Sequence, residues 1–299
     1  MSDKASKLAD AHYHLKKGKK FLSPSLLDLR LKPDWEAAAP LLEKAALIYK
    51  QCGAVDEACS AYELCATAQE KIGSPWHAAK HMETAAELCR QHKVWERVPE
   101  FYKNAAELYI SAGKTTTAAD CLARGAKVVE EQDVEGALAM LYDAIDIYEN
   151  DDKANNANEV FRQLIAACVK ARKWHDAVDA LMRFGTQCEK TGARSSQCRC
   201  YLGAVVVYLY AQEAKPAWQL FQDCLAIDVF VTSEEAYAAD ALFNAYRSGD
   251  ADLIRTVVAK KSVLKELDNQ VARLAVKLPQ ASKLDKMARR LDRLMGEGG

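Results

Sequence analysis

The sequence has few of the residues that break regular structure. Glycine occurs 13 times and proline 7 times in 299 residues, well below the combined share of roughly 12% that is usual in proteins. This scarcity argues against disordered, collagen-like and turn-rich β architectures. Half of the residues are apolar and 28% are charged, which is typical of a helical globular protein. The length allows one or two domains whose cores need no disulfide or metal for stability.

An excess of charge of either sign is also lacking. The chain carries 41 Lys and Arg against 42 Asp and Glu, a formal net charge of -1. A protein of this balance has no bulk electrostatic attraction to nucleic acid. No nucleic-acid partner is therefore predicted.

Long apolar runs are absent. The longest, Cys200–Ala211, has about twelve residues, which is too short to span a bilayer and suits a buried core helix. Residues 1–20 carry charge throughout, so no export signal is expected there. The ten cysteines are spread out without any Cys-x-x-Cys pair, and we expect them to be reduced in a cytoplasmic protein.

A repeat with a step of about twenty residues organises the chain. Pairs of small residues recur at this step, namely Ala45-Ala46, Cys65-Ala66, Ala85-Ala86, Ala105-Ala106 and, more weakly, Gly125-Ala126. A second column follows them, with Gly53, Gly73, Lys93, Gly113 and Asp133. Glycine there suits the left-handed residue that ends a helix. Because about twenty residues make one helix and one turn, two steps predict a helical hairpin.

Small residues at paired positions let neighbouring helix backbones approach closely, while tyrosines one turn away fill the remaining groove. Such helices bury their apolar faces only by stacking. We therefore predict an all-α fold, a right-handed twisted array of antiparallel hairpins resembling a tetratricopeptide superhelix, with a repeat longer than the usual unit of roughly 34 residues.

The expected domain organisation follows from where the repeat weakens. The array is predicted over residues 1–227, and a C-terminal helical bundle over 228–278. Residues 279–299 are expected to form a polar, flexible tail, although Leu284–Met295 also suits a basic amphipathic helix.

Two local patterns resemble catalytic or metal sites. Gly113-Lys114-Thr115 looks like the end of a phosphate-binding loop, but Leu108 stands where another glycine is needed, and a predicted helix precedes it instead of a strand. His77 and His81 lie four residues apart without a third metal ligand nearby. We predict no catalytic residue, no metal and no cofactor.

The segment 21–34 is long and apolar for a connection in a helical array. Its large apolar residues are Phe21, Leu22, Leu26, Leu27, Leu29 and Leu31. Lys16, Lys17, Lys19 and Lys20 lie directly before them. Apolar residues beside a basic cluster suit insertion at an anionic membrane surface. The alternative is that the segment folds back over the open end of the first hairpin.

Taken together, residues 5–278 resemble the soluble NSF attachment proteins (SNAPs), and among them the gamma-type branch. The resemblance rests on Lys32-Pro-Asp-Trp35, on Trp76-His-Ala-Ala-Lys80, and on the pattern from Thr117 to Lys127. It implies an adaptor and not an enzyme. Several copies would bind an assembled, syntaxin-containing SNARE four-helix complex and recruit the AAA+ ATPase NSF, which disassembles that complex. Such a protein serves vesicle fusion and protein transport, including ER–Golgi transport, as a cytoplasmic, peripherally membrane-associated protein.

The resemblance also assigns roles to residues. The basic candidates for the SNARE-facing surface are Lys80, Lys103, Lys114, Arg124, Lys127 and Arg162. Two further basic positions of the family pattern are occupied here by Glu159 and Gln163. The segment 21–34 corresponds to the family's membrane-attachment loop. The NSF-facing candidates are Glu234, Glu235, Asp240, Asp250, Asp252, Leu291 and Leu294.

Two other functions remain open from the residues alone. A general helical-repeat scaffold for an unrelated peptide or helical partner would need the array but no membrane loop. A nucleotide-dependent enzyme built around Gly113-Lys114-Thr115 would be stabilised by ATP.

Overall fold

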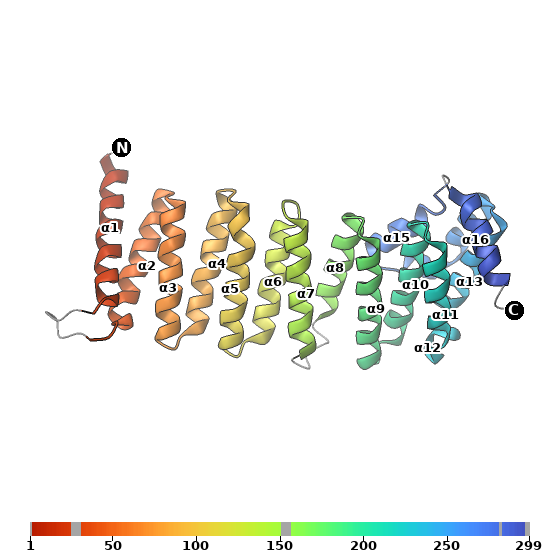
Figure 1. The fold of residues 1–299 in the computed structure, drawn as a ribbon, viewed down its shortest axis with the longest axis horizontal. Coiled ribbons are helices and arrows are strands. Elements are labelled where there is room, and N and C mark those ends of the chain that lie inside the picture. The colour runs from red at the N-terminus through yellow and green to blue at the C-terminus, as the bar shows by residue number, and fades with distance from the viewer. Residues whose placement is uncertain (1, 25–30, 151–156, 281–282, 297–299) are drawn as a thin grey trace. The chain divides into compact units, whose positions relative to one another are not determined.

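The computed structural model describes residues 2–24, 31–150, 157–280 and 283–296, and all regular structure within them is helical (Figure 1). The all-α prediction is confirmed. The chain forms two compact units, Met1–Lys153 and Ala154–Gly299. Each unit has its own buried core.

The first unit is an array in which each helix packs against the next one along the chain (Figure 1). Its elements are α1 (Ser2–Leu22), α2 (Trp35–Cys52), α3 (Val55–Lys71), α4 (Pro75–Gln91), η1 (Trp95–Arg97), α5 (Val98–Ser111), α6 (Thr115–Val129) and α7 (Val134–Asn150). The predicted stack of antiparallel hairpins is therefore present in this unit.

The repeated small pairs lie in the contacts between these helices. Ala45, Ala46, Ala85 and Ala86 are fully buried, so their helix backbones approach closely, as the sequence predicts. Gly53, Gly73 and Gly113 have φ of 67°, 85° and 68°. Lys93 holds the same left-handed conformation at φ 62°.

The fifth position of the turn column behaves differently. Asp133 lies directly before α7 and accepts a hydrogen bond from the backbone N–H of Gly136 at 2.8 Å. Its carboxylate satisfies one of the N–H groups left open at a helix start. The repeat thus changes its turn chemistry at this position.

The second unit begins as hairpins and then folds back on itself. Its elements are α8 (Asn158–Lys170), α9 (Trp174–Lys190), α10 (Arg194–Tyr210), α11 (Ala214–Leu225), α12 (Asp228–Val231), α13 (Glu234–Ser248), α14 (Ala251–Lys260), η3 (Ser262–Lys265), α15 (Asn269–Val276) and α16 (Leu284–Gly296). Helices α13 and α15 pack against α10, and α15 also packs against α8.

The observed units divide the chain at a different place from the expected boundary at 227/228. The helices after residue 228 share one core with α8–α11, because the exceptionally apolar α10 is buried on several sides. Val205, Val206 and Val207 are each fully buried. A helix that is apolar all round needs neighbours on every face, and α9, α11, α13 and α15 supply them.

The expectation of a flexible tail is corrected for residues 283–296, which include α16. Leu284, Met287 and Leu291 are 9%, 4% and 0% exposed. This stripe packs against α11 and α13, and Arg247 of α13 donates to Asp292 at 3.0 Å. The amphipathic helix, which was the other interpretation of this segment, forms because its apolar stripe finds neighbouring helices to cover it.

All ten cysteines are free and buried. Among the described residues, no group of three or more His, Cys, Asp or Glu side chains could hold a metal ion. Within the same residues, every helix is too short or too polar to cross a membrane.

Candidate protein-interaction surface

The basic candidates for a partner-facing surface lie on helices of both units. Lys80 is on α4, Lys103 on α5, Arg124 and Lys127 on α6, and Lys114 is the residue before α6. Arg162 is on α8, in the second unit. All six side chains reach solvent, so all six have the accessibility that a binding role requires.

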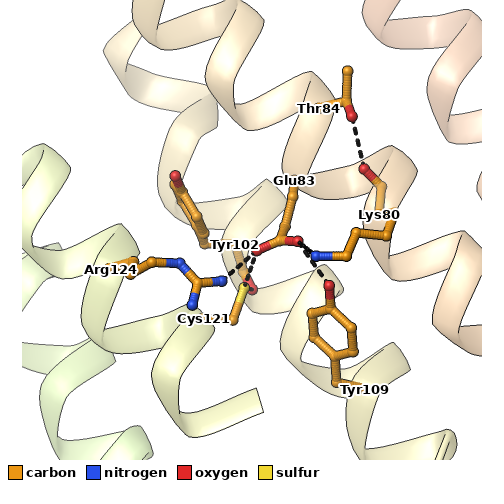
Figure 2. A network of polar contacts seen from close by, with 7 residues as sticks. All are labelled: Lys80, Glu83, Thr84, Tyr102, Tyr109, Cys121 and Arg124. Carbon is orange, nitrogen blue, oxygen red and sulfur yellow. Dashed lines mark hydrogen bonds and ion pairs between the residues drawn. The ribbon is translucent and has the colours of Figure 1, made fainter. Parts of the chain in front are cut away.

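Two of these basic residues meet at a carboxylate that the sequence analysis did not single out (Figure 2). Glu83 of α4 accepts hydrogen bonds from Lys80 Nζ at 2.8 Å and from Tyr109 Oη at 2.7 Å. Its other oxygen accepts from Arg124 Nη2 at 2.5 Å and lies 3.6 Å from Cys121 Sγ. The Glu83 side chain is only 17% exposed. One carboxylate therefore joins α4, α5 and α6.

The charge state of this cluster follows from two opposing effects. Burial raises the pKa of Glu83, but the hydrogen bonds from Lys80, Tyr109 and Arg124 outweigh it, so the net pKa is lowered. The hydrogen bond to Glu83 in turn raises the pKa of Lys80. Glu83 is thus an anion that holds Lys80 and Arg124 in place and offsets part of their charge.

The remaining basic candidates differ in how strongly they are paired. Lys103 Nζ lies 3.8 Å from Asp143, and Arg162 lies 3.8 Å from Glu159 on the preceding turn of α8. Both contacts are long and exposed, and such pairs hold a side chain weakly. Lys114 and Lys127 are exposed and take part in none of the ion pairs between described residues. Among the predicted basic candidates of the first unit, these two are the most available to a partner.

The phosphate-loop interpretation is wrong. Gly113 forms a left-handed turn between two helices, with α5 ending at Ser111 and α6 starting at Thr115. A phosphate-binding loop needs a strand before it, and here a helix precedes the turn.

The apolar segment 21–34 is described in part. Phe21 and Leu22 are half-buried in the last turn of α1, which corrects the expectation that they belong to a loop. Leu31 is 77% exposed, whereas Leu26, Leu27 and Leu29 lie outside the described residues. The backbone N–H of Asp34 donates to the carbonyl of Phe21 at 2.9 Å, which brings the ends of the segment together.

Four lysines lie directly before this segment in the sequence. Lys16, Lys17, Lys19 and Lys20 are all exposed on α1. The basic cluster and the exposed Leu31 are the features that an anionic membrane surface would meet.

Some of the acidic candidates for an ATPase contact already form hydrogen bonds or ion pairs within their own helix. Asp250 accepts hydrogen bonds from the backbone N–H groups of Asp252 and Leu253, so it caps α14. Asp252 pairs with Arg255 at 2.6 Å. Glu234 and Asp240 are exposed on α13.

Two other members of the predicted ATPase-facing set lie inside the unit. Glu235 is 8% exposed and Leu291 is 0% exposed. Leu291 belongs to the α16 core stripe, so the structure corrects its assignment as a partner-facing residue. Leu294, one turn later, is half-buried.

Comparison with known proteins identifies the family. The family model described as "Soluble NSF attachment protein, SNAP" matches residues 4–280. The chain belongs to the SNAP family. Its members are non-enzymatic adaptors, which confirms the prediction that the chain is not an enzyme.

Curated relatives of the chain carry the gamma-type name. A gamma-soluble NSF attachment protein of Arabidopsis thaliana is 36% identical over 84% of this chain and 86% of its own length. One from Dictyostelium discoideum is 26% identical over 93% of this chain and 86% of its own. Among solved structures, the apo form of RapI aligns at 12% identity and TM-score 0.38, covering 87% of this chain and 77% of that one. The family assignment depends on the sequence matches.

Proposed function

We propose that this protein binds assembled SNARE four-helix complexes and recruits the ATPase NSF, which then disassembles them during vesicle fusion and intracellular protein transport. The observation that carries this proposal is the SNAP family match over residues 4–280. The curated gamma-type relatives support it.

The basic residues of α4–α6 suit the first partner. Lys114 and Lys127 are exposed, and Lys80 and Arg124 are positioned by Glu83. A bundle of SNARE helices with an acidic surface would be attracted to such a face, with the strongest effect on the association rate. Several copies of the protein would surround one bundle.

The N-terminal segment suits a membrane, and the second unit suits the ATPase. Exposed lysines at the end of α1 lie beside apolar residues of segment 21–34, a combination that favours an anionic bilayer. Glu234, Asp240 and Asp252 are the exposed acidic residues we propose for the NSF contact.

The test is ATP-dependent disassembly of a purified SNARE complex by NSF in the presence of liposomes, with and without this protein. Disassembly should require the protein. The double variant K114E/K127E should bind the SNARE complex at least about tenfold more weakly at low salt, because two attractions become repulsions.

A matched control separates this surface from net charge. Lys44 and Lys71 are exposed on α2 and α3, and K44E/K71E changes the net charge equally. Loss of binding in both double variants would show that the face is wrongly chosen. A folded protein that supports no disassembly, beside a working attachment protein, would favour a scaffold for another helical or peptide partner.

A further inference from the structure

The second unit contains a charged cleft of about 360 Å³. Side chains from α8, α9, α10 and the segment before α15 line it. Its charged residues are Arg162, Arg199, Glu266 and Asp268. Only Arg162 was among the predicted basic candidates.

The floor of the cleft is apolar and firmly packed. Ile165 and Leu181 are 0% and 2% exposed, and Phe184 and Leu267 are each 6% exposed. The phenyl rings of Phe184 and Phe161 stack with their centroids 5.0 Å apart. A cleft with a buried apolar floor and a few charged groups above it has the composition of a binding site.

Arg199 presents a half-used hydrogen-bonding edge to this cleft. Its Nη2 donates to Glu266 Oε2 at 2.6 Å. Its Nε is buried and has no hydrogen-bond partner among the described residues. Nε and Nη2 form one side of the guanidinium, and a carboxylate bound to that side can accept from both. Glu266 uses only one of the two donors.

The contact between Glu266 and Arg199 is one that the carboxylate of a ligand could replace. Its side chain is 49% exposed, whereas that of Arg199 is 39% exposed. A single-point contact at this exposure stabilises the pair weakly. A buried donor without an acceptor is costly, so a ligand that satisfies both Nε and Nη2 would have an advantage over Glu266.

The charged residues of the cleft favour a single carboxylate over a doubly charged anion. Glu266 and Asp268 line it together with the two arginines, so a doubly charged anion such as phosphate meets repulsion as well as attraction. A single carboxylate needs only the Arg199 edge and the field of Arg162. The apolar floor can take an apolar side chain attached to the same ligand.

We propose that this cleft binds the carboxylate of an aspartate or glutamate side chain on a protein partner, in the place now held by Glu266. An apolar side chain next to that acid in the partner would lie on the floor formed by Leu181 and Phe184. Identifying the partner as the SNARE four-helix complex rests on the proposed function. The cleft itself does not.

The cleft can be tested without the partner by titrating the full-length protein with sodium acetate and following the arginine Nε–H signals by NMR. The signal of Arg199 should shift in a saturable way. Arg255 serves as the reference, since it is 60% exposed and paired with Asp252 on one helix. Sodium phosphate should bind less tightly than acetate.

Two variants should change acetate affinity in opposite directions. E266Q removes the competing charge and should strengthen acetate binding about threefold or more. R199K keeps the positive charge but loses the two-donor edge, and should weaken binding about tenfold. D252N and R255K are the matched controls and should change nothing. A merely structural role of the Arg199–Glu266 pair would not produce tighter binding in E266Q.

Three results would overturn the cleft proposal. They are an Arg199 signal that shifts no more than that of Arg255, an E266Q variant that binds acetate no more tightly than the wild type, and tighter binding of phosphate than of acetate.

The partner is tested separately with the SNARE complex. R199K should weaken its binding about tenfold and E266Q should strengthen it. Normal binding by both variants would exclude the cleft as the SNARE contact. A wild-type protein that does not bind the complex at all would contradict the proposed function, while the acetate titration would still decide the cleft.

Discussion

Glu83 is the residue on which the basic face of α4–α6 depends most. Its carboxylate receives donors from Lys80, Tyr109 and Arg124. Because these donors come from three helices, loss of the carboxylate would affect both the packing of the helices and the position of the two cations. The same residue therefore serves stability and the proposed partner surface.

E83Q is expected to lower the free energy of unfolding by about 1–3 kcal/mol, because a buried charge-assisted cluster loses its centre. Since the pKa of Glu83 is lowered from 4.5, its contribution is complete above that value and is lost as the pH falls through the folded-state pKa. The difference between wild type and E83Q in urea unfolding should therefore shrink as the pH falls below 4.5.

Glu87 supplies the control on the same helix. It pairs with Arg90 at 2.6 Å, with both side chains at least 40% exposed. E87Q should change stability by less than about 0.5 kcal/mol at neutral pH. Equal losses in E83Q and E87Q would contradict a special role for the Glu83 cluster.

Gly185 is required by the close approach of α9 and α10. A Cβ at this position would lie 2.6 Å from Tyr201 Cε1, and Tyr201 is only 3% exposed. G185A should destabilise the protein by about 1–3 kcal/mol in urea unfolding, because neither side can yield.

Gly203 on α10 is the matched control. Its added Cβ would meet Leu181 Cδ2 at 3.4 Å, an ordinary contact. G203A should be neutral or stabilise by up to about 1 kcal/mol through helix propensity. Equal stability of the two variants would show that the Gly185–Tyr201 contact adapts without cost.

At the scale of elements, the ends of the two units differ in what their amphipathic helices do. α16 buries its apolar stripe against α11 and α13. The end of α1 instead leads into a segment whose Leu31 is 77% exposed. An apolar side chain that is exposed near lysines in the sequence does not contribute to the packing of the core. Its exposure therefore favours the membrane interpretation of segment 21–34.

Removing the apolar side chains of this segment should strongly weaken liposome binding. The variant L26S/L27S/L29S/L31S is expected to bind phosphatidylserine-containing liposomes at least about tenfold more weakly in a flotation assay. Each leucine that enters the bilayer stabilises the membrane-bound state, and serine does not. Its far-ultraviolet circular dichroism should be unchanged.

The control removes exposed apolar side chains elsewhere. Leu47, Ile110, Leu253 and Val276 are 48%, 44%, 42% and 70% exposed, and the variant with serine at these four positions should bind liposomes normally. Unchanged binding by the segment variant would support the alternative that the segment covers the first hairpin.

At the scale of the whole molecule, the chain consists of two compact units that meet in sequence at Lys153 and Ala154. Helical arrays are stabilised mainly by contacts between neighbouring helices. Dividing the chain where few of these contacts are lost therefore leaves fragments that fold. A cut between residues 227 and 228 would instead separate α10 from α13 and α15, and α11 from α16.

Fragments should therefore behave according to the observed units. Residues 1–153 and 154–299, expressed separately, are each expected to be helical and to unfold cooperatively in circular dichroism melts. Residues 228–299 alone should show no cooperative transition, because the buried stripe of α16 and the core faces of α13 and α15 lose their partners. A cooperative transition in that short fragment would support the boundary expected from sequence.

Much of the fold was predictable because it is local. The step of about twenty residues, the buried pairs such as Ala85 and Ala86, and the left-handed turns at Gly53 and Gly113 follow from contacts between helices adjacent in sequence. Lys114 and Lys127 were named as basic candidates from the resemblance to the SNAP family, and both are exposed in the structure.

The tertiary structure alone decided what depends on distant residues. Glu83 meets Tyr109 and Arg124 across 26 and 41 positions of the chain, and Arg199 meets Glu266 across 67. Leu291 could be a surface contact or a core residue until its neighbours were known. A periodic pattern determines which face of a helix is apolar, but only packing in three dimensions determines what covers that face and which charges meet.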